Sequence, residues 1–150
     1  MNQYLNGLIQ AGLVLGEWDQ SKVGGLSPQF FWDRRTFVDF RGDLRICPRN
    51  VTLGFWVKLI TATHDFTTGE LGHRISVPVH IEQHAFIGSY ALLHNCMIRH
   101  HARVGCGAVV VNKDVPPYTT VAGNPARIVS EWINGVWVRK DIDVPRISLS

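Results

Sequence analysis

The feature that most constrains the fold of this chain is a spacing of six residues between aliphatic side chains, several of them followed directly by glycine. A helix repeats about every 3.6 residues and an amphipathic strand every two, so neither element accounts for this spacing. A chain that turns a corner every six residues does account for it, because each short face then places one aliphatic side chain inward. Three faces form a triangular coil, and stacked coils predict an all-β fold, the parallel β-helix. The residues in phase are Leu53, Leu59, Ile81, Ile87 and Leu93 and, after a slip of one residue, Ile98, Val104 and Val110.

A β-sandwich is the alternative fold, because its strands also carry Val and Ile with glycine at the turns. Its polar loops would recur about every 8–12 residues, whereas the segment 81–111 has no such loops. Alanine recurs instead at corners where a larger side chain would collide with the next coil. These corner residues are Ala85, Ala91, Ala102 and Ala108.

The length of 150 residues suits one domain with a single core. We expect an aromatic cluster, Phe30-Phe31-Trp32, to help cover the open end of the stack, because uncovered strands would expose the core. The C-terminal segment is helix-like at 130–133, breaks at Asn134-Gly135 and then has a β-branched run at 136–138. The predicted parts are an N-terminal cap over 1–35, a β-helix over 36–129 with a loop at 64–78, and a C-terminal tail over 130–150.

Composition excludes several other classes of protein. Hydrophobic residues make up 45% of the chain and charged residues 18%, against about 25% charged in an average domain, so disorder is not expected. The net charge of +3 is spread along the chain, which does not favour nucleic acid as a partner. No apolar run approaches the roughly 18 residues that span a bilayer, so we expect no membrane insertion. The three cysteines form no Cys-x-x-Cys pair and suit a reducing compartment, so we expect a cytoplasmic protein.

A polar segment interrupts the repeat after Ile60, and His64 lies near its start. Functional groups concentrate on loops whose ends are held by a rigid scaffold. A neutral imidazole accepts a proton from a hydroxyl near neutral pH, so His64 is a candidate general base. The alternative is that His64 is one of seven histidines without a special role, as we expect for His100 and His101 on a solvated face.

Three features together resemble the left-handed β-helix acetyltransferases. They are the hexads, the sequence Thr61-Ala62-Thr63-His64, and the segment from Lys113 to Arg127, which contains Val-Pro-Pro and then Gly-Asn-Pro-Ala-Arg. The resemblance covers residues 45–129. It is greatest to the branch that O-acetylates sugars, of the maltose, galactoside and nodulation-factor type, and to related enzymes of surface-polysaccharide biosynthesis.

This resemblance implies a left-handed coil, acetyl-CoA as the donor, a sugar-type acceptor and a homotrimer with active sites between adjacent subunits. His64 matches the histidine that acts as general base on the acceptor hydroxyl. The implied reaction is a direct transfer without an acyl-enzyme, in which backbone N–H groups stabilise the oxyanion. No metal is expected.

The resemblance also implies a path for the donor. Gly105, Gly107 and Ala108 match the stretch that lines the pantetheine arm, and Lys113 and Arg127 match positions near the nucleotide end, where cations meet phosphates. Each has a structural alternative, because the two glycines also suit a bend and the lysine suits a solvated surface.

The chain departs from the family pattern at several positions. The asparagine that many sugar acetyltransferases carry upstream of the histidine has only Asp39 and Asn50 as candidates, and the segment 99–103 is basic. A second hypothesis is a zinc protein like the γ-type carbonic anhydrases, in which His94 matches one ligand but Ser89 stands at the preceding ligand position. A third is a non-catalytic scaffold subunit with the same fold.

Overall fold

The computed structural model describes residues 14–15, 36–47 and 49–140, and within these ranges all regular structure is β. None of the described residues belongs to a helix that could cross a bilayer. Apart from residues 14–15, the predicted cap over 1–35 lies outside the described residues. The strands are β1 Val14–Leu15, β2 Phe37–Asp39, β3 Asp43–Ile46, β4 Thr52–Leu53, β5 Lys58–Ile60, β6 Ala62–His64, β7 Arg74–Ser76, β8 Pro78–Ile81, β9 Phe86–Ile87, β10 Leu92–Ile98, β11 Arg103–Val104, β12 Val109–Val115, β13 Thr119–Ala122, β14 Arg127–Ile133 and β15 Val136–Arg139.

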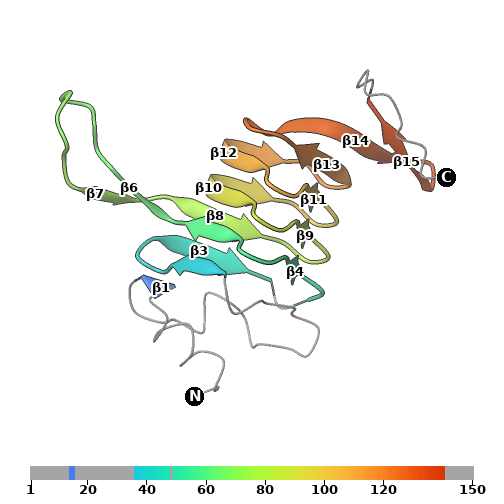
Figure 1. Cartoon of the computed structure of the whole chain (residues 1–150), viewed down its shortest axis with the longest axis horizontal. Coiled ribbons are helices and arrows are strands. Elements are labelled where there is room, and N and C mark those ends of the chain that lie inside the picture. The colour runs from blue at the N-terminus through green and yellow to red at the C-terminus, as the bar shows by residue number, and fades with distance from the viewer. Residues whose placement is uncertain (1–13, 16–35, 48, 141–150) are drawn as a thin grey trace, which may run out of the picture.

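The strands stack into a coil with three faces, as the hexads predict (Figure 1). The first face contains β1, β2, β5 and the first halves of β10 and β12, and the second contains β3, β8 and the second halves of the same two strands. The third face contains β4, β9, β11 and β13. All these pairings are parallel, so each coil lies directly on the one before it.

Regular coils are 17 residues long, because Leu93 lies opposite Val110 and Arg99 contacts Glu82 of the coil before. This is one residue fewer than three hexads. The missing residue is explained by the corner inside β10 and β12, where a single residue with positive φ turns the chain: Asn95 (46°) and Asn112 (52°). Asparagine tolerates this conformation better than most residues do. The slip in the sequence pattern is therefore a one-residue corner.

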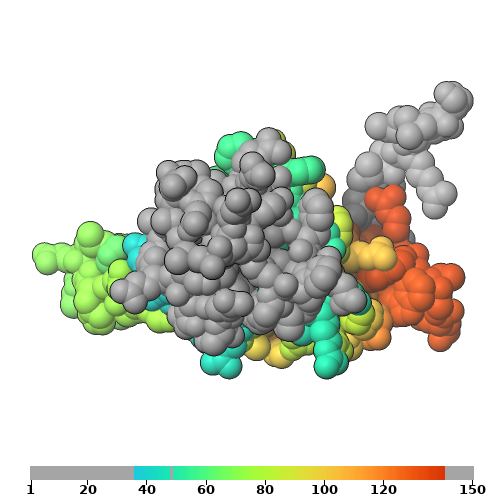
Figure 2. All heavy atoms as spheres, turned by 90° about the horizontal axis from the view of Figure 1, so that it is seen from below, coloured from blue at the N-terminus to red at the C-terminus, as the bar shows by residue number. Residues whose placement is uncertain are grey.

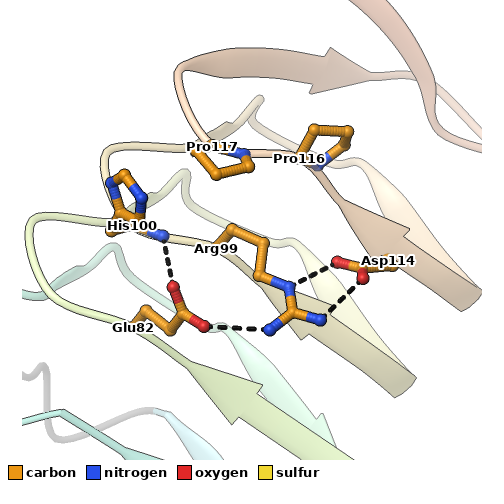
Figure 3. Close-up of a pocket in the computed structure, with 6 residues that line it drawn as sticks. All are labelled: Glu82, Arg99, His100, Asp114, Pro116 and Pro117. Carbon is orange, nitrogen blue, oxygen red and sulfur yellow. Dashed lines mark hydrogen bonds and ion pairs between the residues drawn. The ribbon is translucent and has the colours of Figure 1, made fainter.

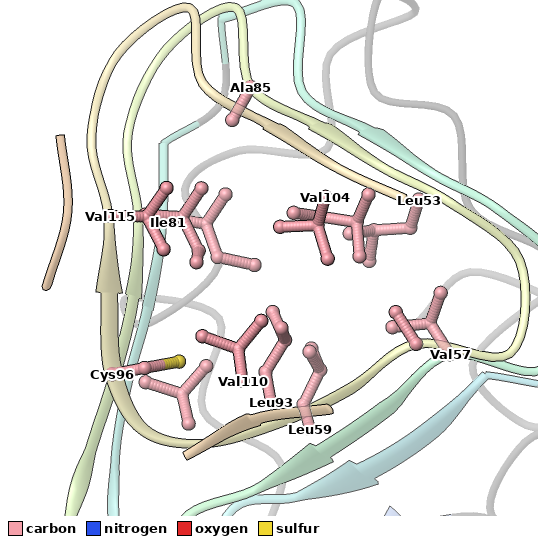
Figure 4. Close-up of a cluster of buried hydrophobic side chains, with 14 of the residues drawn as sticks. Leu53, Val57, Leu59, Ile81, Ala85, Leu93, Cys96, Val104, Val110 and Val115 are labelled. Atoms are coloured by element: carbon pink, nitrogen blue, oxygen red, sulfur yellow. The ribbon is translucent and has the colours of Figure 1, made fainter. Parts of the chain in front are cut away.

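The core is a stack of aliphatic side chains on the axis of the coil (Figure 4). Each face contributes one column or more, and burying one such side chain contributes about 1.5–3 kcal/mol. Burial raises the pKa of the Cys96 thiol to about 12, so this cysteine packs as a small apolar residue. The columns are Val38, Leu59, Leu93 and Val110; Leu44, Val79 and Cys96; Ile46, Ile81, Ile98 and Val115; and Leu53, Ile87, Val104 and Val121.

Aromatic rings stack along the corner that joins the second and third faces. His84, His101 and Tyr118 have φ between 56° and 59°, a conformation that costs a residue with a bulky side chain about 1–2 kcal/mol. Their rings stack at 4.6 Å between centroids, which offsets part of that cost. His100 touches the same column, with its Nδ1 3.1 Å from Nδ1 of His101. His100 and His101, expected on a solvated face, are half-buried in this column.

The C-terminal hairpin corrects the helix-like interpretation of residues 130–133. Residues 127–133 form β14, which pairs antiparallel with β13 and β15, and this pairing overrides the local helical pattern. The predicted break is a two-residue turn at Asn134 and Gly135, both with positive φ, as a tight hairpin requires. Figure 2 shows this hairpin and the arm formed by β6 and β7 projecting from opposite sides of the coil.

Candidate functional site

The polar interruption of the repeat forms a projecting arm, which we define as residues 62–76. Its strands β6 and β7 pair antiparallel, with His64 opposite Arg74 (Figure 1). The carboxylate of Asp65 accepts a hydrogen bond from Thr67 N at 2.9 Å, and Gly69 turns the tip with a φ of 80°. The arm leaves the coil between Ile60 and Val79, at the corner where the later coils turn with a single asparagine.

His64 lies on the arm with its side chain exposed. Among the described residues, none forms a hydrogen bond or an ion pair with its imidazole. Both ring nitrogens therefore remain available to a substrate hydroxyl, which is what a general base requires.

The arm is joined to the coil by a buried polar network at Thr61. The Thr61 hydroxyl donates to the carbonyl oxygen of Asp39 at 2.5 Å and accepts from Gly42 N at 3.0 Å. Where the chain returns to the coil, Val77 N donates to the carbonyl oxygen of Thr61 at 2.8 Å. The side chain of Thr61 and that of Asp39 are fully buried.

Arg41 holds the Asp39 carboxylate in this network. It donates from its backbone N at 3.0 Å, from Nε at 2.8 Å and from Nη2 at 3.1 Å. Burial acts to raise the pKa of Asp39, but the hydrogen bonds and the charge of Arg41 outweigh it and hold the pKa below its ordinary value. Of the two candidates for the family's upstream asparagine, Asp39 lies at the arm, whereas Asn50 lies at another corner and contacts His84.

The three predicted pantetheine-lining residues lie at the corner between β11 and β12. Gly107 turns this corner with a φ of 68°. A Cβ on Gly105 would lie 3.0 Å from the Cβ of Ala122, which is a tight contact, so glycine suits the stacking of coils there. Ala108 is buried in the core. Packing thus accounts for Gly105 and Ala108 and backbone conformation for Gly107, and the contact of all three with a donor stays a prediction.

The two predicted phosphate-binding cations lie together. Lys113 Nζ donates to the carbonyl oxygen of Ala126 at 3.2 Å, and Arg127 Nη1 donates to the same oxygen at 3.0 Å. Lys113 directly follows Asn112, so this pair of cations lies near the corner from which the arm leaves two coils earlier. A basic group and the histidine-bearing arm therefore share one edge of the coil.

The basic segment 99–103 is engaged in contacts within the chain. Arg99 binds both oxygens of Asp114, at 2.8 and 2.7 Å, and Glu82 at 3.1 Å, and these hydrogen bonds raise the pKa of its guanidinium (Figure 3). Arg103 lies 4.0 Å from the centre of the Trp137 ring. The hollow beside Arg99, about 540 Å³ and walled by two prolines, has its charged groups already paired with one another.

The residues matched to a zinc site have other contacts. His94 Nδ1 lies 3.0 Å from the carbonyl oxygen of Ile60, and the Ser89 hydroxyl accepts from Phe55 N at 3.1 Å. No group of three or more metal-binding side chains gathers within the described part of this chain.

Arg41, Gly42 and Thr61 are site residues that the sequence did not single out. Thr61 was noted only as part of the sequence before His64. The signal that was present is the spacing of Asp39 and Arg41, two residues apart and directly followed by glycine, but nothing in it indicates a contact with a residue 19 positions later.

Comparison with known proteins relates these coils to acyltransferases, although no family model matches the chain. A Schizosaccharomyces pombe protein named as an acetyltransferase is 40% identical over 81 residues, which are 52% of this chain and 39% of the relative. An acyl-[acyl-carrier-protein]–UDP-N-acetylglucosamine O-acyltransferase from Alkalilimnicola ehrlichii is 43% identical over 63 residues, 41% of this chain and 23% of the relative. This chain thus matches well under half the length of either relative.

Two solved structures share the fold. A maltose O-acetyltransferase from Clostridium difficile has a TM-score of 0.56 at 28% identity, covering 68% of this chain and 55% of that one. A hexapeptide-repeat acetyltransferase from Vibrio cholerae, solved with acetyl coenzyme A, has a TM-score of 0.51 at 29% identity, covering 64% and 56%. The predicted fold class and the predicted resemblance are confirmed: the described coils form a left-handed β-helix that is similar to those of hexapeptide-repeat acetyltransferases.

Proposed function

We propose that this chain is an acetyl-CoA-dependent acetyltransferase that transfers acetyl to a hydroxyl of a sugar or a surface-polysaccharide precursor. The observation that carries the proposal is His64, exposed and unengaged on an arm whose root is buried in the coil. The solved relative named as a maltose O-acetyltransferase and the one solved with acetyl coenzyme A support the acceptor and donor classes.

In the proposed reaction, the imidazole of His64 takes the proton from the acceptor hydroxyl as that oxygen attacks the thioester carbonyl. Backbone N–H groups stabilise the oxyanion, an effect typically worth about 2.7–4 kcal/mol. The intermediate then collapses, the carbon–sulfur bond breaks, and the thiolate takes the proton from the imidazolium. The products are an acetyl ester and CoA, and no covalent enzyme intermediate forms.

We further propose that Lys113 and Arg127 bind the phosphates of CoA, since the two cations already meet at one carbonyl oxygen. Because the arm points away from its own coil, we propose a homotrimer in which the arm of one subunit meets the donor held by the next.

The test is acetyl transfer from radiolabelled acetyl-CoA to a panel of mono- and oligosaccharides. His64→Ala should lower kcat at least about 100-fold, the range expected for a lost general base. His73→Ala is the matched control, because His73 is another exposed histidine of the same arm, and it should stay within a few-fold of wild type. An unchanged rate for His64→Ala would refute the general base, and no acetyl-CoA binding by calorimetry would favour a non-catalytic scaffold.

A further inference from the structure

The root of the arm is a cluster of buried polar groups that hydrogen-bond to one another. Buried polar side chains need hydrogen-bond partners, and an unpaired one is strongly unfavourable. Here the Thr61 hydroxyl uses both its donor and its acceptor capacity, toward Asp39 and Gly42. Polar groups arranged in this way hold the two segments in one relative position.

The turn at residues 39–42 packs closely against Thr61. A Cβ on Gly42 would lie 1.7 Å from the carbonyl oxygen of Thr61, so the backbone of the turn makes direct contact with the arm root. Within that turn, Arg41 binds the Asp39 carboxylate through both its backbone N and its side chain. The turn therefore belongs to the coil before the arm and holds Thr61, the residue directly before the arm.

The arm itself has little else to hold it. Among the described strands, β6 and β7 pair only with each other, and a two-stranded hairpin alone is marginally stable in water. Its apolar side chains at Phe66 and Leu71 are 60% and 69% exposed within this chain. The direction of the arm is thus set mainly at its root, three residues before His64.

We propose that Asp39, Arg41 and Thr61 act as positioning residues that aim the arm, and with it the imidazole of His64, at the acceptor. This inference rests on the proposed function, because it assigns a purpose to the direction of the arm. None of the three touches the reacting atoms; they act through the arm. A displacement of about 1 Å in a catalytic group can lower a rate about 100-fold, so loss of the hydroxyl contact should appear in kcat.

The test combines kinetics with hydrogen exchange on the full chain. Thr61→Val keeps the shape of the side chain and removes the hydroxyl, whereas Thr61→Ser keeps the hydroxyl. Thr120→Val is the matched control, since Thr120 lies on the third face, away from the arm. We expect Thr61→Val to lower kcat at least tenfold with KM for acetyl-CoA within about twofold, and to speed amide exchange in residues 62–76 at least tenfold. Thr61→Ser and Thr120→Val should resemble wild type in both measurements.

Arg41→Met provides the second variant, because Arg41 lies at the surface and its loss leaves the Thr61 hydroxyl in place. We expect Arg41→Met to lower kcat and to speed exchange in the arm as well. This variant carries the test if Thr61→Val does not fold. Exchange and kcat equal to those of Thr120→Val in both variants would overturn the positioning role. If exchange in the arm rises and kcat falls for Thr61→Val while His64→Ala keeps full activity, the arm is positioned by its root but the general-base role of His64 fails. If exchange rises with kcat unchanged, the positioning role itself is overturned.

Discussion

Removal of the Arg41 side chain tests whether the buried carboxylate of Asp39 depends on its cation. Arg41→Met keeps the length of the side chain and the backbone hydrogen bond, and removes the bonds from Nε and Nη2 at 2.8 and 3.1 Å. Breaking one side of a buried ion pair typically costs about 3–5 kcal/mol. The Asp39 side chain is 0% exposed but that of Arg41 is 34% exposed, so water replaces part of the lost interaction. We therefore expect the free energy of unfolding at pH 7 to fall by about 2–3 kcal/mol.

The loss of unfolding free energy in Arg41→Met should become smaller as the pH falls. The pKa of Asp39 in the folded protein lies below its ordinary value, so this carboxylate stabilises the fold above the unfolded pKa of about 3.9. That contribution disappears as the pH falls through the folded pKa. In Arg41→Met, burial remains without the cation, which raises the pKa of Asp39 and lets it take up a proton at higher pH. The stabilities of variant and wild type should therefore converge as the solution is acidified.

Urea unfolding followed by circular dichroism measures the free energy of unfolding of variant and wild type at pH 7 and at stepwise lower pH. Protein concentration must be constant, because assembly would shift the apparent stability. Arg45→Met is the matched control: Arg45 pairs with Asp43 at 3.0 Å, but both side chains are exposed, at 71% and 39%, so a loss below about 1 kcal/mol is expected. Equal losses for the two variants, or an Arg41→Met loss that persists unchanged in acid, would refute the reasoning.

Three further predictions concern the arm root, the aromatic corner and the basic pair. Gly42→Ala should lower the free energy of unfolding by more than about 3 kcal/mol in the same urea experiment, because its Cβ would overlap the Thr61 carbonyl oxygen; a stable variant would contradict that contact. Burial and two neighbouring histidines lower the pKa of His101, so the folded state favours the neutral ring, and stability should decline as pH drops below about 6.5. His101→Asn should flatten that decline, and an unchanged slope would remove His101 as its cause. Lys113→Ala combined with Arg127→Ala should raise KM for acetyl-CoA at least about tenfold with little change in kcat, and an unaltered KM would exclude both cations from the donor site.

The fold could be predicted from the sequence because side chains of similar size recur every six residues along the coil. Most inward positions hold an aliphatic side chain and several corners hold alanine, so residues such as Leu93 and Ala102 reveal the coil directly. The tail shows the limit of local patterns. Residues 130–133 have a helix-like order of apolar residues, and only their pairing partners on β13 and β15 make them a strand.

Only the part of the candidate site that lies in a short sequence motif could be predicted. His64 follows a recognisable sequence and lies on the predicted excursion. The network around Thr61 left no such signal, because its hydroxyl contacts a main-chain oxygen 22 residues earlier, and a backbone acceptor has no residue type to identify it. The ring column through His101 was missed for a similar reason, since its members recur once per coil and are not adjacent in sequence.

One corner of the coil behaves as an insertion point. The later coils cross it with one asparagine, and the coil that carries the arm crosses it with a far longer segment. His94 therefore lies opposite Ile60 at a separation of 34 residues, where the later coils have 17. The surplus equals one complete coil, and the stacked body above and below remains in register. A change in the length of this segment would therefore alter what projects from the corner while the pairing of the coils on either side stays the same.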